Sequence, residues 1–200
     1  MERIERYARE HQIEAGRVRI LMLGDGSGND SLHLVNRGFR VDYFDVPGSR
    51  TFEFAHKRFQ YYSVLGDAVQ LITDYERISP GGYDVVLSFE VLEHLTNPPA
   101  SIRDMARFLK EGGIALVTEA FAGVTDALPT HLAANKQYSG RTPFLFLEAG
   151  LHLTWYSQPL FKPYEFTKLT GSAHSTRWRL LRDKFIMKAF LKARLHEIRA

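Results

Sequence analysis

Three closely spaced glycines and the aspartate that follows them are the residues of this sequence best suited to binding a ligand. Gly24, Gly26 and Gly28 stand in the run Gly-Asp-Gly-Ser-Gly, directly after an apolar stretch. A glycine-rich turn between a buried strand and a helix lets backbone N–H groups approach a ligand closely. An acidic residue at the end of the next strand suits a ribose diol, and Asp45 lies 17 residues beyond Gly28. The pattern therefore indicates a ligand that contains a nucleoside.

The spacing of the glycines argues against a dinucleotide. The dinucleotide fingerprint requires a third glycine three residues after the second. Counted from Gly24 and Gly26, that position holds Asn29, and counted from Gly26 and Gly28 it holds Ser31. We therefore expect the chain not to bind NAD.

A second set of residues could move a proton. Glu93 and His94 follow an apolar stretch, and His131 and Tyr138 stand in the polar segment 122–141. A neutral hydroxyl is a weak nucleophile, and an imidazole that titrates near neutrality suits a general base. We predict His131 as the base and His94 as its competitor, with Glu93 and Tyr138 contacting the substrate.

No metal site is predicted from the spacing of possible ligands. Glu119, Asp126 and His131 are of types that bind magnesium or zinc, but no tight ligand spacing links them. The chain contains no cysteine, which excludes thiolate zinc sites, iron–sulfur clusters, disulfides and cysteine nucleophiles. We interpret the two carboxylates as solvated loop residues.

The elements that must position these residues alternate as they do in a parallel α/β sheet. Residues 18–23 are almost continuously apolar, which is typical of a strand buried on both faces. Right-handed crossovers predict a doubly wound, mostly parallel seven-stranded sheet with helices on both faces and a ligand crevice at the carboxyl ends of the strands. Further strands are expected at 40–45, 61–65, 83–89, 114–119, 151–156 and 164–168, and helices at 2–14, 30–37, 50–58, 67–75, 100–109 and 143–149.

Composition places this sheet in a single folded domain. The 200 residues are 44% hydrophobic and 24% charged, which is close to the average of globular chains. We assign residues 1–170 to the domain. The first sixteen residues lack the apolar core of a signal peptide, and no apolar run reaches the length of a membrane span. A cytoplasmic location is therefore expected.

The C-terminal segment 171–200 differs from the rest of the chain in charge. It carries 8 Lys and Arg against 2 Asp and Glu. Residues 176–199 are predicted to form a basic amphipathic helix whose apolar surface is wider than one face. We expect this helix to pack on its own domain or on a second copy in a homodimer. An anionic membrane surface and nucleic acid are the less favoured alternatives.

The motifs together resemble the class I S-adenosylmethionine-dependent methyltransferases, in particular the small-molecule group that includes ubiquinone-biosynthesis enzymes. The segment LMLGDGSGN resembles the first motif of that family, FRVDYFD the second and SVLGDA the third. The segment that begins YDVVLSFEVLEHL resembles the fourth and fifth, and EVLEHL is its most specific part. The resemblance covers about residues 16–156 and implies a Rossmann-like methyltransferase fold.

The resemblance also implies S-adenosylmethionine as cofactor and assigns roles at the strand ends. The glycine-rich turn would face the methionine part of the cofactor. Asp45 would hold the ribose hydroxyls, and Asp67 would contact the adenine amine. Phe89 and Glu90 would line the site beside the sulfonium.

Two positions depart from the family pattern. The family usually has an acidic residue two positions before its first glycine, where this chain has Met22, and a small residue where this chain has Asp25. Asp25 could contact the ammonium group of the cofactor, or it could cap the turn or face water. We expect these departures to leave cofactor binding intact.

The function predicted from the sequence is methyl transfer to a small polar acceptor, with an oxygen of a sugar or another hydroxyl metabolite as the preferred target. An RNA methyltransferase guided by the basic C-terminal helix is one alternative. A cofactor-binding subunit without activity of its own is another. Activity that is indifferent to salt would argue against the RNA alternative.

Overall fold

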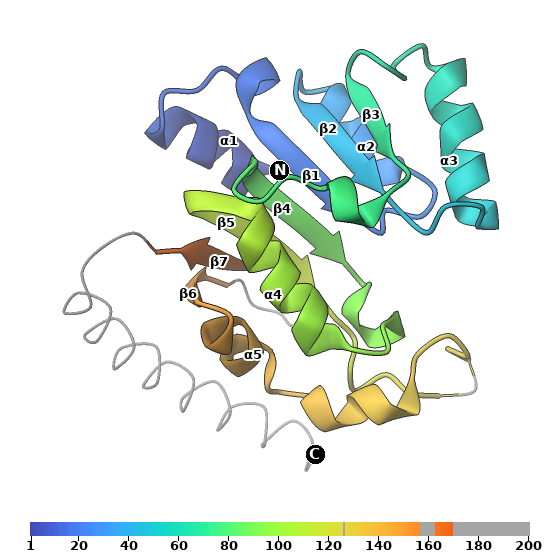
Figure 1. The fold of residues 1–200 in the computed structure, drawn as a ribbon, viewed down its shortest axis with the longest axis vertical. Helices are drawn as coiled ribbons and strands as arrows, with labels where there is room; N and C mark the ends of the chain where they lie inside the picture. Colours follow the sequence, from blue (N-terminus) through green and yellow to red (C-terminus); the bar gives the residue numbers. More distant parts are fainter. Residues whose placement is uncertain (126, 157–162, 170–200) are drawn as a thin grey trace.

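The computed structural model describes residues 1–125, 127–156 and 163–169. Its strands form one sheet in the order β3-β2-β1-β4-β5-β7-β6 (Figure 1). Strands β1 to β5 are parallel, and β7 runs antiparallel to both β5 and β6. The predicted seven-stranded, mostly parallel sheet is confirmed. The strand bounds are β1 Arg19–Leu23, β2 Arg40–Phe44, β3 Val69–Ile72, β4 Tyr83–Phe89, β5 Leu109–Thr118, β6 Leu151–Trp155 and β7 Tyr164–Lys168.

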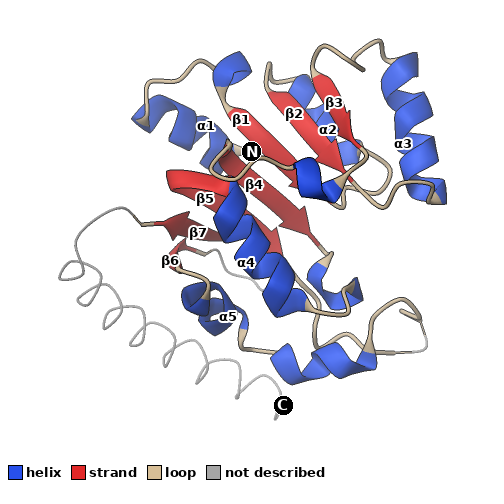
Figure 2. Ribbon diagram, in the orientation of Figure 1, coloured by secondary structure: helices blue, strands red, loops and turns tan. Residues whose placement is uncertain are grey.

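Helices cover both faces of the sheet (Figure 2). Helices α1 (Glu2–Glu10), α2 (Asn29–Val35) and α3 (Arg50–Tyr61) pack on one face, where they meet side chains of β1 and β2. Helices α4 (Pro98–Phe108) and α5 (Thr142–Glu148) pack on the other. The helices on both faces agree with the doubly wound architecture expected from the sequence.

The sequence of strand β1 is almost continuously apolar because both of its faces are buried. Ile20 and Met22 join the core beneath α1 and α2, whereas Leu21 and Leu23 join the core beneath α4. All four side chains are buried, because successive residues of a strand point to opposite faces. Met22 therefore stands in the core.

The third strand was predicted in the wrong place. Residues 61–65 are not a strand, because α3 continues to Tyr61, whose side chain is 82% exposed. Residues 67–75 are not a helix, because Val69 is buried and pairs with Val41 of β2 in the strand β3. The prediction followed the aromatic and β-branched residues of 61–65, which favour strands. Intrinsic strand propensity is a weaker determinant of position than pairing with a neighbouring strand and burial against the core.

Three short 3-10 helices follow strands β3, β4 and β5 along the chain. They are η2 (Tyr75–Arg77), η3 (Leu92–His94) and η4 (Ala133–Tyr138). In the part of the chain that the structure describes, no helix is long and apolar enough to cross a membrane. The predicted helix 176–199 and Asp126 lie outside the described residues.

Candidate functional site

The glycine-rich turn after β1 and the aspartate after β2 are joined by hydrogen bonds. The Gly26 N–H donates to Asp45 Oδ2 at 2.9 Å, and the Val46 N–H donates to Asp45 Oδ1 at 2.7 Å. The Tyr43 hydroxyl donates to the Gly26 carbonyl at 2.7 Å. Asp45 thus fixes the turn from the neighbouring strand, and its carboxylate lies at the carboxyl edge of the sheet, as predicted.

An apolar hollow of about 120 Å³ opens beside this turn. It is smaller than the roughly 300 Å³ of a typical whole-ligand pocket, so it suits one part of a ligand, such as a flat ring system. The buried Ser88 hydroxyl lines the hollow and makes no hydrogen bond. The residues lining the hollow come from the ends of β1 to β4 and from α4: Leu23, Gly24, Phe44, Asp45, Val46, Tyr75, Ser88, Val91, Leu95, Ser101 and Met105.

Two glycines of the turn are required for different reasons, which a pair of variants separates. A Cβ at Gly28 (φ +78°) would lie 2.5 Å from Cζ of the fully buried Phe59, whereas a Cβ at Gly26 (φ +57°) would meet nothing within 4 Å. Gly28→Ala is expected to lower the free energy of unfolding by about 2 to 4 kcal/mol, and Gly26→Ala by about 1 kcal/mol. Urea unfolding measures both, and equal losses would contradict this description of the turn.

Asp25 caps helix α2. Its Oδ1 accepts from the Asp30 N–H at 3.1 Å and its Oδ2 from the Ser31 N–H at 2.7 Å. Burial raises the pKa of Asp25, and these hydrogen bonds oppose that rise. Of the uses considered for Asp25, capping is the one that the contacts support, because both oxygens already accept from the backbone.

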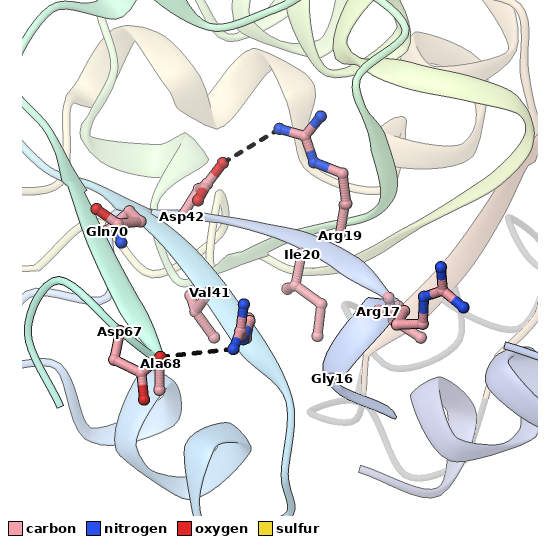
Figure 3. A pocket seen from close by; sticks show the side chains of 11 residues that line it. Gly16, Arg17, Arg19, Ile20, Val41, Asp42, Asp67, Ala68 and Gln70 are labelled. Carbon is pink, nitrogen blue, oxygen red and sulfur yellow. Dashed lines mark hydrogen bonds and ion pairs between the residues drawn. The ribbon is translucent and has the colours of Figure 1, made fainter. Parts of the chain in front are cut away.

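Asp67 does not lie with Asp45, and the prediction that they stand at successive strand ends is wrong. Asp67 precedes β3 and pairs with Arg40, the first residue of β2, at 3.5 Å. It lines a polar hollow at the amino ends of the strands (Figure 3). The glycine-rich turn follows the carboxyl end of β1 and so lies at the opposite edge of the sheet. Strand β2 separates this edge from Asp45 by roughly 15 Å. The error follows from the misplaced third strand.

The residues that do follow β3 are Asp74 and Tyr75, which the sequence analysis missed. The Tyr75 ring lines the apolar hollow with its centroid 5.1 Å from that of Phe44. Asp74 accepts from the Glu76 N–H at 3.1 Å and so begins η2. The signal for this strand end was weak: the segment Val-Gln-Leu-Ile at 69–72 is apolar at three of its four positions and is followed by Thr73 and Asp74.

The turn after β4 continues from the hollow into a cluster of titratable groups. Glu90 has φ +53°, an unusual backbone conformation for a residue with a side chain, and its N–H donates to Thr118 Oγ1 at 3.0 Å. Val91 then lines the hollow, and η3 presents Glu93 and His94. Strained residues of this kind concentrate at functional sites. Phe89, which ends β4, is partly buried against the core beneath α1 and α2.

Glu93 is a buried acid without a good partner. Its side chain is 1% exposed, and neither carboxyl oxygen makes a hydrogen bond of acceptable geometry. Burial, which is the largest cause, acts together with the neighbouring carboxyl groups of Glu90 and Glu119 to raise the pKa of Glu93 to about 7, and its own backbone N–H opposes the rise. A charged group in this position is costly unless a cation joins it.

The loop after β5 brings His131 onto this acid. His131 Nε2 lies 4.0 Å from Glu93 Oε1, and the rings of His131 and His94 meet edge to face with centroids 4.8 Å apart. The Leu132 N–H donates to the Glu93 carbonyl at 3.0 Å, and Asn135 Nδ2 donates to the same carbonyl at 3.0 Å. These bonds hold η4 and its loop against η3. We call Glu93, His94 and His131 the acid–histidine cluster.

Two other candidates lie outside the acid–histidine cluster. The Tyr138 ring packs against the buried Phe121 ring, with centroids 5.7 Å apart. Glu119 accepts from the Phe121 N–H at 3.0 Å and from Thr142 Oγ1 at 2.7 Å. Through these contacts, Tyr138 and Glu119 pack beneath the loop that follows β5.

Comparison with known proteins points to one family. The sequence profile of the methyltransferase domain family matches residues 2–164. The Ubiquinone biosynthesis O-methyltransferase of Xanthomonas euvesicatoria pv. vesicatoria is 32% identical over 103 residues, which cover 51% of this chain and 43% of that protein. Several such enzymes from other bacteria match to a similar extent. The chain spans less than half the length of these curated relatives.

Solved structures share the fold. A SAM dependent methyltransferase from Aquifex aeolicus superposes with a TM-score of 0.61 at 14% identity, covering 82% of this chain and 87% of that one. The O-methyltransferase NcsB1 from neocarzinostatin biosynthesis, solved with S-adenosylmethionine and 2-hydroxy-5-methyl naphthoic acid, gives a TM-score of 0.58 at 20% identity. That match covers 76% of this chain and 49% of NcsB1. At these identities the likeness concerns the fold alone.

Proposed function

Because this chain belongs to the methyltransferase domain family, as the match over residues 2–164 shows, we propose that it transfers the methyl group of S-adenosylmethionine to an oxygen of a small hydroxyl compound. The observation that supports the proposal most strongly is that the turn after β4 contributes residues to both the apolar hollow and the acid–histidine cluster. The segment after β4 contributes Val91 to the apolar hollow and Glu93 to the acid–histidine cluster. Donor and acceptor sites are therefore neighbours.

The residues present fit the donor. The apolar hollow lined by Tyr75 and Val91 suits an adenine ring, and the Ser88 hydroxyl, buried there without a hydrogen bond, is available to a bound ligand. The Asp45 carboxylate suits the ribose hydroxyls, although it now accepts from the backbone of the turn. The Gly26 backbone borders open space, so a ligand can lie against it. That Phe89 and Glu90 flank the sulfonium stays a prediction.

The acid–histidine cluster supports oxygen as the methylated atom. The donor carries a reactive methyl group, so the protein has mainly to align donor and acceptor and exclude water. An amine or a thiolate needs little further help, whereas a hydroxyl must lose its proton. A buried carboxylate beside two imidazoles is a costly arrangement that a reaction without proton removal would not need.

In the proposed reaction the O–H bond of the acceptor breaks at the acid–histidine cluster, and the oxygen forms a bond to the methyl carbon. The S–CH₃ bond breaks, and its electron pair stays on sulfur. The products are a methyl ether, S-adenosylhomocysteine and one proton. A sugar or another hydroxyl metabolite remains the acceptor class that we propose.

Two experiments separate this function from its alternatives. Calorimetry is expected to show binding of S-adenosylmethionine and S-adenosylhomocysteine and none of NAD. Tighter binding of NAD would overturn the donor assignment. Labelled donor is then incubated with a library of small hydroxyl compounds and, separately, with total RNA. Label in RNA that falls steeply with added salt would favour the RNA alternative, and donor binding without turnover would favour a subunit without activity of its own.

A further inference from the structure

The three members of the acid–histidine cluster are placed as metal ligands are. One possible ligand atom from each of Glu93, His94 and His131 lies within 4.8 Å of the other two. Ligands at about 2.1 Å from a tetrahedral ion stand roughly 3.4 Å apart, so small side-chain rotations would close the site around an ion. Ligand spacing in the sequence does not indicate this site, because His131 lies 37 positions beyond His94.

Unpartnered buried atoms give a second and independent indication of a ligand. Both carboxyl oxygens of Glu93 and Nδ1 of His131 are buried without a hydrogen-bond partner. Their side chains are only 1% and 8% exposed. Native proteins rarely leave such atoms unsatisfied unless an ion, a water or a catalytic role accounts for them. A cation at this point would pair with Glu93 and offset its repulsion by Glu90 and Glu119.

A hydrogen bond to a backbone carbonyl orients the His94 ring in a way that suits metal binding. Its Nδ1 lies 3.0 Å from the Thr130 carbonyl oxygen. A carbonyl only accepts, so Nδ1 carries the proton in the neutral ring and Nε2 keeps its lone pair. Metal-bound histidines in proteins commonly donate their second ring N–H to a carbonyl in this way, which fixes the tautomer and the ring orientation.

We propose that Glu93, His94 and His131 bind one divalent transition-metal ion that holds and ionises the hydroxyl of the acceptor. Two imidazoles and one carboxylate favour zinc, cobalt, manganese or iron over magnesium and calcium, which prefer oxygen ligands. This revises the expectation of no metal site. Three protein ligands leave coordination positions open, as catalytic sites do.

The catalytic part of this inference rests on the proposed function. The acceptor oxygen would bind the ion, which lowers the pKa of its O–H group, and the proton would pass to water. The bound oxygen would then attack the methyl carbon of the donor, and the electron pair of the S–CH₃ bond would remain on sulfur. The ion undergoes no change of oxidation state.

The test titrates the full chain, stripped of metal by a chelator, with ZnCl₂ and CoCl₂, and with MgCl₂ as the comparator. We expect one Zn²⁺ per chain, a visible Co²⁺ spectrum that reports nitrogen ligands, and much weaker Mg²⁺ binding. Loss of a supporting residue alone weakens metal binding about 10- to 100-fold. Loss of a ligand in Glu93→Gln or His131→Ala is therefore expected to weaken Zn²⁺ binding by about 100-fold or more.

The matched control is His33→Ala, which removes an exposed histidine of α2 and is expected to bind Zn²⁺ as the wild type does. Circular dichroism checks that each variant is folded, and His94→Gln serves if one of the others is not. Thermal unfolding adds a second readout, since Zn²⁺ should raise the Tm of the wild type and of His33→Ala but not of Glu93→Gln. Equal Zn²⁺ affinity in the wild type and the ligand variants would overturn the site.

Activity distinguishes failure of this inference from failure of the proposed function. Unchanged methyl transfer after chelation would overturn the catalytic role of the ion and leave the methyltransferase standing. Stoichiometric Zn²⁺ binding without transfer to any hydroxyl compound would overturn the proposed function and leave the metal site standing.

Discussion

His131→Ala is expected to lower kcat for methyl transfer to a hydroxyl acceptor by about 10²- to 10⁴-fold, which is the usual cost of losing a group that removes a proton. His131 Nε2 is 4.0 Å from Glu93 Oε1, and its ring meets that of His94. Its removal dismantles the acid–histidine cluster, whether the imidazole takes the proton itself or holds an ion that lowers the pKa of the acceptor hydroxyl.

The same variant should leave the donor site intact, because the residues that line the apolar hollow come from the strand ends and α4 rather than from the loop of His131. Steady-state kinetics at saturating donor gives kcat, and calorimetry gives the Kd of S-adenosylmethionine. Wild-type kcat in His131→Ala would contradict the assignment and favour a nitrogen or sulfur acceptor, which needs no such group.

Asp45→Ala is expected to weaken S-adenosylmethionine binding by about 2 to 3 kcal/mol, or roughly 30- to 150-fold. The variant removes a carboxylate suited to both ribose hydroxyls. It also removes the acceptor of the Gly26 N–H, so the turn loses a restraint from β2. Both effects act on the donor, and kcat at saturating donor should change far less than Kd.

Asp67→Ala is the matched control for that measurement. Asp67 is an aspartate beside the neighbouring strand, but it lies at the amino edge of the sheet and pairs with Arg40. The Kd of the donor should therefore stay at the wild-type value. A loss in Asp67→Ala as large as that in Asp45→Ala would show that the donor does not bind at the carboxyl edge.

Most of the fold could be predicted because its strands carry a strong local signal. Strand β4 spans 83–89 as expected, since its side chains are buried on both faces and five of its seven residues are apolar or aromatic. Strand β3 could not be located in this way. Its four residues include Gln70, and the more aromatic run just before it ends a helix instead. Pairing with β2 decides the position of β3, and a sequence window does not contain that partner.

The candidate site likewise contains a part that could be predicted from the sequence and a part that could not. Gly24, Gly26 and Asp45 were identifiable because a turn after a strand and an acid after the next must meet at one edge of a parallel sheet. Glu93 and His131 were each candidates from the sequence, but their meeting depends on how the loop after β5 folds back. The hydrogen bonds of Leu132 and Asn135 to the Glu93 carbonyl fix that path, and no spacing in the sequence encodes it.

The central claim, methyl transfer to oxygen at the acid–histidine cluster, is tested most directly by three acceptors that share one scaffold and carry a hydroxyl, an amino or a thiol group. Each is incubated with the wild-type chain and labelled S-adenosylmethionine, and the labelled product is identified by mass spectrometry. We expect an O-methyl ether from the hydroxyl compound, formed together with one S-adenosylhomocysteine, and a loss of that product in His131→Ala. Transfer to the amine or thiol that persists in His131→Ala, with no ether formed, would contradict the claim.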